Sequence, residues 1–130
     1  MAASLNLFKK EKDNKREFGE KLETFAAEKL SDYGLEILTR NYLCKMGEID
    51  IIARDSQNLI FVEVRYRKND AFGGPIASVN RKKQQRVILA AGHYLQKHQL
   101  TNKVACRFDV FAITGSLNQL DYNWIKAAFT

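Results

Sequence analysis

The sequence predicts a single α/β domain, and three observations lead to this class. Apolar residues recur every three or four positions in segments 16–33 and 78–98, which is typical of amphipathic helices. Four β-rich segments, expected to be strands, are 35–43, 47–54, 59–67 and 104–113. The chain has 130 residues, of which 45% are hydrophobic, so it can bury one core but is short for two domains. The expected element order is therefore α-β-β-β-α-β.

Turn and cap residues set the limits of these elements. Gly34 follows the first helix at a position that favours a left-handed backbone. Ser78 is suited to cap the second helix, which we expect to run to about His98. A loop with the only proline, Pro75, separates the third strand from this helix. After the last strand we expect a short edge strand at 120–122 and a helical turn at 123–129.

Composition and spacing exclude several classes of protein and of site. No apolar run approaches the ~18 residues of a membrane span, and the N-terminus lacks the order of a signal peptide. We therefore expect a cytoplasmic protein with no membrane contact. Cys44 and Cys106 show neither metal-binding nor disulfide spacing and are expected to be small buried apolar residues. Asp109 is expected to play a structural part by pairing with Arg107 or with a helix residue.

The formal charge of +6 is concentrated in one segment of the chain. Residues 65–86 contain seven basic side chains and a single acid, Asp70. A localised basic patch indicates a polyanionic partner, nucleic acid first. A solvated helix face, or a basic face that meets an acidic protein, is the alternative. Residues 9–21 instead mix both signs, so we expect 1–16 to be a flexible charged leader ahead of a single domain at 17–130.

The strands 47–54 and 59–67 are expected to bring two acids together. They flank four residues, a common length for a hairpin loop, so that Arg54 pairs with Leu59 and Asp50 lies opposite Glu63. Side chains alternate along strands. One face then carries Glu48, Asp50, Glu63, Arg65 and Arg67, and the other carries Ile49, Ile51, Val62 and Val64.

Two carboxylates placed this way repel each other by on the order of 3 kcal/mol at an effective dielectric of ~20. A protein can keep such a pair by raising one pKa, or by holding a cation such as Mg²⁺ between the two oxygens. An exposed pair neutralised by Arg65 or Arg54 is the simpler alternative. Glu23 borders the apolar face of the first helix, beside small residues, and is expected to approach Asp50 and Glu63 as a third acid.

The second helix begins with three basic residues and a glutamine, which are Arg81, Lys82, Lys83 and Gln84. Positive side chains in a first turn oppose the helix dipole, at a cost of ~0.3–1 kcal/mol each. Helix N-termini bind phosphate well, so contact with a phosphate backbone is a fitting use for these side chains. Ordinary helix surface is the alternative.

The motifs that carry a family resemblance are Gly47-Glu-Ile-Asp-Ile-Ile-Ala-Arg54, Phe61-Val-Glu-Val-Arg65, Ala71-Phe-Gly-Gly-Pro75 and Asn80-Arg-Lys-Lys-Gln-Gln-Arg86. Together they resemble the YraN-like family of small bacterial proteins of uncertain function. That family is similar to the restriction-endonuclease-like superfamily, especially archaeal Holliday-junction resolvases. The resemblance implies an αβββαβ endonuclease-like core, with a central mixed sheet flanked by helices.

The resemblance also implies roles for individual residues through the PD-(D/E)xK pattern of the superfamily. Asp50 and Glu63 correspond to the two strand acids, with Glu23 as the helical acid and the backbone carbonyl of Val64 as a further metal ligand. Gln84 falls where some members carry a helical glutamine. The pattern calls for lysine at position 65, where this chain has Arg65. Arginine stays protonated and cannot act as a general base, but it can hold a phosphate.

These observations predict a nuclease that hydrolyses DNA with Mg²⁺ or Mn²⁺, selective for branched or single-stranded forms. Asp50, Glu63, Arg65 and Glu23 are the expected catalytic residues. The residues expected to bind nucleic acid are Arg67, Lys68, Arg81, Lys82, Lys83, Gln84 and Arg86. The alternatives are a nucleic-acid-binding module of the same fold without catalysis, and a domain that binds an acidic protein. The resemblance is compatible with a homodimer.

Overall fold

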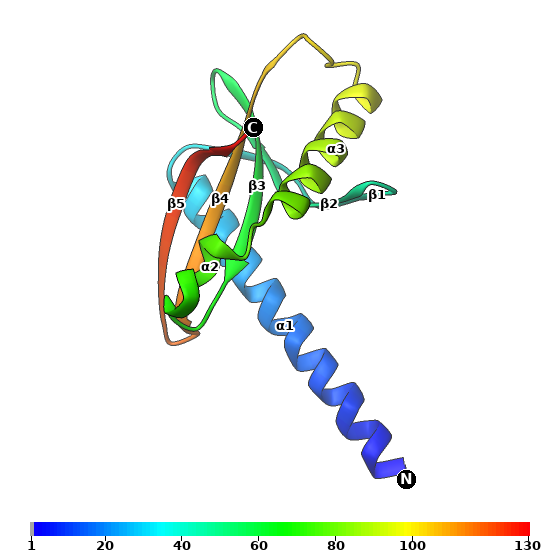
Figure 1. Ribbon diagram of the computed structural model, residues 1–130, viewed down its shortest axis with the longest axis vertical. Coiled ribbons are helices and arrows are strands. Elements are labelled where there is room, and N and C mark those ends of the chain that lie inside the picture. The colour runs from blue at the N-terminus through cyan, green and yellow to red at the C-terminus, as the bar shows by residue number, and fades with distance from the viewer. Residues whose placement is uncertain (1) are drawn as a thin grey trace.

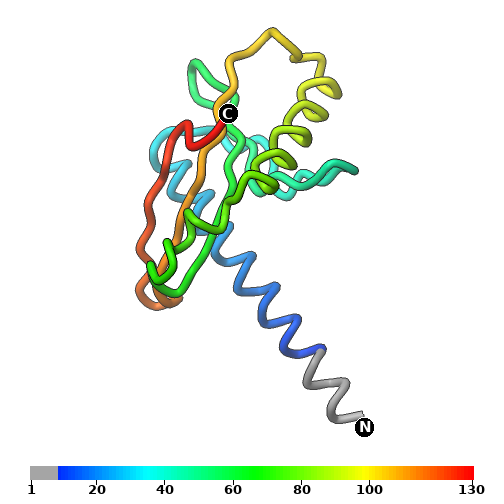
Figure 2. The backbone as a smooth tube through the Cα atoms, viewed as in Figure 1, coloured from blue at the N-terminus to red at the C-terminus, as the bar shows by residue number. Residues whose placement is uncertain are grey.

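A computed structural model describes residues 2–130 of the chain, with side chains described from residue 9 onward (Figures 1 and 2). Its elements are α1 (Ala2–Asp32), β1 (Glu36–Cys44), β2 (Gly47–Arg54), β3 (Asn58–Tyr66), the 3₁₀ turn η1 (Ala71–Gly73), α2 (Gly74–Ala77), α3 (Arg81–Lys97), β4 (Ala105–Ser116) and β5 (Gln119–Phe129). The predicted α/β class and the order of the first six main elements are confirmed. Over residues 2–130, no helix combines the length and the apolar character needed to cross a bilayer.

The five strands form one mixed sheet in the order β1-β2-β3-β4-β5. All neighbouring pairs are antiparallel except β3 and β4, which are parallel. A parallel pair needs a crossover connection, and α3 supplies it. Helix α3 lies on one face of the sheet and the C-terminal half of α1 on the other, whereas residues 9–16 of α1 extend beyond the sheet (Figure 1).

Each face of the sheet has its own apolar core. On one face Val87, Ala90 and Tyr94 of α3 pack against Phe61 and Val110. The other core joins α1 to the opposite side of the same strands, through Leu22, Ala26, Leu30, Ile51, Ala53, Ile60, Val62, Phe111 and Ile113. Consecutive β3 residues therefore alternate between the two cores, as expected for a strand buried on both faces.

The predicted register of the β2–β3 hairpin is confirmed, with Arg54 opposite Leu59 and Ile51 opposite Val62. The predicted placement of Ile49 is wrong, because Ile49 packs on the α3 face and Ile51 on the α1 face. On the neighbouring strand, Asn41 has a left-handed backbone (φ 55°) between Arg40, which pairs with Ile51, and Tyr42, which pairs with Ile49. This conformation interrupts the alternation of side chains between the two faces of the sheet, at Asn41 on β1 and at Asp50 on β2.

Three further expectations are corrected at the ends of elements. Helix α3 is capped by Asn80, whose side-chain oxygen accepts from the Lys83 N–H at 2.9 Å, and not by Ser78. The segment expected to form a short strand and a helical turn is one long strand, β5, because Leu120, Tyr122 and Trp124 alternate onto the α1 face. Cys106 is exposed, within the exposed stretch 101–106, and Cys44 is only half-buried.

Helix α1 also extends further toward the N-terminus than the predicted helix of 16–33. It begins at Ala2, so the segment 2–16 of the predicted leader is helical. All side chains from Lys9 to Glu17 are exposed. The face of the helix that packs on the sheet starts near Phe18 and Leu22. The division into a leader at 1–16 and a domain at 17–130 stays a prediction.

Candidate functional site

The candidate site lies where β2 and β3 separate. Their ladder ends at Ile51 and Val62, so the backbone of Val64 lacks a partner on β2. The Val64 N–H donates instead to Asp50 Oδ2 at 2.9 Å. The interrupted alternation at Asp50 thus places its carboxylate in the gap between the two strands. Buried N–H groups need an acceptor, and this one is provided by a side chain.

Glu63 lies beside Asp50 and is buried among apolar residues, with only 2% of its surface exposed. It points to the α3 face, where its Oε2 lies 3.9 Å from Lys83 Nζ. That oxygen makes no hydrogen bond with any described residue. Burial, and then the neighbouring Asp50 carboxylate, raise the pKa of Glu63 to about 9, although Lys83 and Arg65 oppose the shift. Glu63 therefore keeps its proton at neutral pH unless another cation enters.

Glu23 approaches the site from α1 but is already paired. Its carboxylate accepts from Arg40 Nε at 3.0 Å, and its side chain is 12% exposed. Burial raises its pKa, the Arg40 hydrogen bond lowers it, and the nearby charge of Asp50 raises it further. Among the side chains described, those of residues 9–130, there is no group of three or more His, Cys, Asp or Glu arranged to hold a metal ion. The structure thus brings Asp50 and Glu63 together but leaves Glu23 with Arg40.

A cavity of about 580 Å³ opens beside these acids, between α1 and the ends of β2 and β3. Its wall includes Glu23, Asp50, Arg65 and Arg67, so acidic and basic side chains meet in it. Glu63 is buried and does not line this cavity, and its side chain lies next to Lys83 of α3. A ligand in the cavity would therefore reach Asp50 from the α1 side, while Lys83 approaches Glu63 from the α3 side.

The side chains predicted to contact phosphate, seven basic residues and Gln84, fall into two groups. The exposed ones are Arg67, Lys68, Arg81, Lys82 and Arg86. Three others are half-buried and hold specific partners. Arg65 Nε donates to Ser78 Oγ at 2.8 Å, and Gln84 Nε2 donates to the Val79 carbonyl at 3.1 Å. Lys83 faces Glu63 as described above. Arg65 thus links the end of β3 to the segment that precedes α3.

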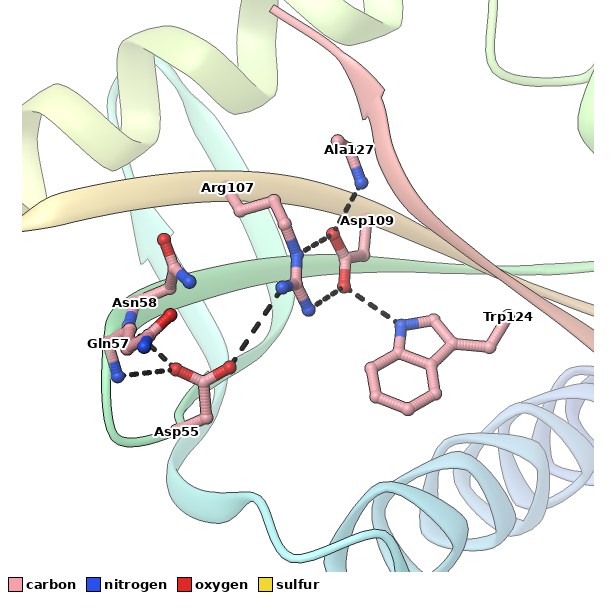
Figure 3. A network of polar contacts seen from close by, with 7 residues as sticks. All are labelled: Asp55, Gln57, Asn58, Arg107, Asp109, Trp124 and Ala127. Carbon is pink, nitrogen blue, oxygen red and sulfur yellow. Dashed lines mark hydrogen bonds and ion pairs between the residues drawn. The ribbon is translucent and has the colours of Figure 1, made fainter.

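A second buried acid, Asp109, belongs to a fully paired network (Figure 3). Its two oxygens accept from the Arg107 guanidinium at 2.8 and 2.9 Å, from Trp124 Nε1 at 2.8 Å and from the Ala127 N–H at 3.0 Å. Arg107 also lies 3.9 Å from Asp55, which closes the β2–β3 turn by accepting from the N–H groups of Gln57 and Asn58. The predicted pairing of Asp109 with Arg107 is confirmed. Both carboxylate oxygens of Asp109 accept two hydrogen bonds each.

Sequence reasoning missed two partners within the site. Arg40 neutralises Glu23, and Ser78 orients Arg65. Regular alternation would place Arg40 and Tyr42 on one face, but the left-handed Asn41 sends them to opposite faces. The sequence predicts Ser78 as the N-cap of the second helix, but Asn80 occupies that position. An asparagine inside a strand was the one available signal of the irregular backbone.

The fold and the site together define a class of protein. It is an α/β protein in which a buried acid, Glu63, lies beside a partly exposed one, Asp50, where two central strands separate, with basic side chains nearby. A model of the uncharacterised protein family UPF0102 matches residues 22–113. The chain belongs to this family, as the resemblance in its motifs predicted. This family assignment names no activity.

Relatives in other bacteria match most of the chain. A UPF0102 protein of Stutzerimonas stutzeri is 47% identical over 111 residues, which is 85% of this chain and 92% of the relative. One from Saccharophagus degradans is 46% identical over 114 residues, covering 88% and 93% of the two chains. One from Hahella chejuensis is 52% identical over 98 residues, covering 75% and 77%. The similarity therefore includes β2, β3 and α3, the elements that build the site.

Proposed function

We propose that the protein is a divalent-metal-dependent nuclease that hydrolyses phosphodiester bonds in DNA. The observation that carries the proposal is the buried Oε2 of Glu63, which has no hydrogen-bond partner and lies beside a second carboxylate. A buried polar group without a partner is costly, by about 1–3 kcal/mol and more when it is charged. A cation shared with Asp50 would remove that cost and allow Glu63 to ionise.

The residues present fit Mg²⁺ or Mn²⁺ with two carboxylates. Asp50 and Glu63 would hold the ion, with the Val64 carbonyl as a further oxygen ligand. Mg²⁺ is usually bound by one or two carboxylates together with substrate phosphates, so a third acid is not required. Glu23 would join only by leaving Arg40. When bound, such an ion lowers the pKa of a coordinated water and stabilises the charge on the leaving oxygen.

Two basic side chains, Arg65 and Lys83, would together take the roles of the lysine expected at position 65, which are to bind the phosphate and to orient the water. Arg65, held by Ser78, would bind the scissile phosphate and stabilise the charge that develops on it, because a guanidinium stays protonated. Lys83 is the only lysine whose ammonium group lies within 4 Å of an acid among the described residues. Because this ammonium group lies beside the buried acid, Lys83 is our candidate for orienting the attacking water.

The exposed basic residues around the site would bind the flanking backbone. Arg67 and Lys68 follow β3, and Arg81, Lys82 and Arg86 lie on the first turns of α3. Contacts of this kind fix the position of a strand but read no base sequence. The proposal therefore includes selectivity for the shape of the nucleic acid and not for its sequence.

A second candidate function is a nucleic-acid-binding module that has lost catalysis. Arg65 in place of lysine favours it, and so does the engagement of Glu23 by Arg40. The two candidates share the basic surface and differ in whether Asp50 and Glu63 act on a bound phosphate. Only an assay that measures binding and cleavage separately distinguishes them.

The test is cleavage of branched, single-stranded and duplex DNA by the wild type with Mn²⁺ or Mg²⁺, beside Asp50→Asn, Glu63→Gln and Lys83→Met. The matched control is Asp121→Asn, which alters an exposed acid on β5. We expect metal-dependent cleavage by wild type and control, and at least a hundredfold less by the three site variants. Binding at low salt without cleavage under any metal would reject the nuclease and favour the binding module.

A further inference from the structure

The most exposed large apolar side chain of the described residues belongs to Phe72, whose relative exposure is 103%. Phe72 also has a left-handed backbone, with φ 56° and ψ 33°. This conformation costs a residue with a Cβ about 1–2 kcal/mol, and an exposed phenyl ring recovers none of that cost through burial. Both features are unfavourable for the isolated protein, and strained residues of this kind cluster at functional sites.

The loop around Phe72 is built to hold the ring outward. Just before Phe72 in the chain, the Ala71 N–H donates to Asn69 Oδ1 at 2.9 Å. After Phe72, Gly74 and Pro75 are buried, and Ser78 donates to the Pro75 carbonyl through both its N–H and its hydroxyl. The adjoining helix α2 packs on β4 (Figure 1).

The two glycines after Phe72 tighten this loop. A Cβ on Gly73 would lie 2.7 Å from the Ala77 Cβ, and one on Gly74 would lie 2.8 Å from Asp70 Oδ1. Both residues also have positive φ angles, of 88° and 64°. Because positions 73 and 74 accommodate only glycine, the turn that follows Phe72 is closely packed. We infer that this packing fixes the backbone conformation of Phe72.

The loop connects directly to the candidate site and to its basic surface. Arg67 and Lys68 precede it, and Arg81 and Lys82 follow it, all four exposed. Ser78 at its far end holds Arg65, which lies close enough to Glu63 to lower its pKa. A polyanion bound along these side chains would therefore pass the ring of Phe72. Aromatic rings that stack on bases add ~1–3 kcal/mol per base to single-strand binding, in any sequence.

We infer that Phe72 stacks on an unpaired nucleobase of the bound nucleic acid, so that the site selects DNA in which paired and unpaired segments meet. This inference rests on the proposed function for its ligand, and it adds the residue that would recognise the unpaired segment of the DNA. A base inside a duplex is already stacked on its neighbours and offers Phe72 no free face. The ring would thus contribute to binding of forked, branched or single-stranded DNA and not to binding of intact duplex.

The test is binding in EDTA, where cleavage plays no part, measured by fluorescence anisotropy at low salt. Wild type, Phe72→Ala and Phe72→Tyr are each titrated into a forked DNA and into the corresponding duplex. The matched control is Tyr33→Ala, which removes another exposed aromatic ring, next to Trp124 on the α1 face. A 2-aminopurine placed in the unpaired arm reports stacking directly, through quenching of its emission.

We expect Phe72→Ala to weaken binding of forked DNA by about 5- to 150-fold, which corresponds to ~1–3 kcal/mol, and to abolish the quenching. Phe72→Tyr and Tyr33→Ala should bind as the wild type does, and duplex affinity should not change. Equal affinity of Phe72→Ala and wild type for forked DNA would overturn the inference and leave the proposed function standing. An equal loss for fork and duplex would also overturn it. Absence of nucleic-acid binding by the wild type would reject both.

Discussion

Two buried carboxylates on neighbouring strands, Glu63 on β3 and Asp109 on β4, illustrate how side-chain environment indicates function. Asp109 accepts four hydrogen bonds and pairs with Arg107, so its charge is compensated within the protein. Glu63 keeps one oxygen without a partner, and its nearest neighbours are another acid and a lysine at 3.9 Å. The unpaired oxygen of Glu63 is therefore the basis of the proposed metal site, whereas the paired carboxylate of Asp109 stabilises the fold.

The raised pKa of Glu63 predicts how its substitution changes stability with pH. In the folded protein Glu63 holds its proton up to about pH 9, but in the unfolded chain it releases the proton near its ordinary value of 4.5. Its contribution to stability is therefore present below about pH 4.5 and is lost as the pH rises toward 9. Glu63→Gln should exceed the wild type in unfolding free energy at pH 8.5, by on the order of 1–3 kcal/mol, and match it near pH 4.5.

Urea unfolding of both proteins in metal-free buffer measures this difference. The comparison at each pH cancels the titration of the other groups. Parallel pH profiles for the two proteins would show that Glu63 ionises in the fold as it does in the unfolded chain.

Substitution of Asp109 should lower the free energy of unfolding, in contrast to Glu63→Gln, which should raise it. Removal of its carboxylate by Asp109→Ala leaves the Arg107 guanidinium, half-buried, and the Trp124 N–H without their acceptor. Breaking a buried ion pair from one side costs about 3–5 kcal/mol. We expect a loss of that size in thermal or urea unfolding, with no change in any response to divalent metal. A loss below 1 kcal/mol would contradict the structural part assigned to this network.

At the scale of elements, the β2–β3 hairpin could be predicted from the sequence and its β1 neighbour could not. A four-residue loop between two strongly apolar strands determines the register, and hence the closeness of Asp50 and Glu63. The same argument fails one strand away, because regular alternation assumes extended backbone at every residue. Asn41 departs from it, and a single left-handed residue exchanges the faces of Arg40 and Tyr42.

The backbone at Asn41 gives a prediction at this scale. Asn41→Val should destabilise the protein by about 1–2 kcal/mol, because a β-branched residue does not tolerate φ 55°. It should also weaken any binding of Mn²⁺, since the irregularity directs Asp50 toward Val64. Asn41→Gly is the control and should preserve both properties. Thermal unfolding with and without Mn²⁺ checks this, and an unaltered metal response in Asn41→Val would separate the irregularity from the site.

For the whole molecule, the sequence predicted a central sheet flanked by helices because the apolar periodicities of its helices and strands are long. The position of Glu23 was predicted only in part, since its partner Arg40 depends on the left-handed residue in β1. The end of the chain was predicted only in part. A short strand at 120–122 was expected, but antiparallel pairing with β4 continues through the predicted helical turn, with Ile125 opposite Val110 and Phe129 opposite Phe108. DNA as the ligand, the cytoplasmic location and a homodimer stay predictions.

The most direct test of the central claim is the thermal unfolding of the full chain titrated with MnCl₂ or MgCl₂ at pH 8 and at pH 5.5. A metal that binds only the folded state stabilises it by RT ln(1 + [L]/Kd), about 2.7 kcal/mol at a hundred times Kd. We predict a rise in Tm that depends on metal concentration, is larger at pH 8 because the proton competes for Glu63, and is absent in Asp50→Asn and Glu63→Gln. A Tm unchanged at 20 mM metal, or an equal rise in both variants, would contradict the account.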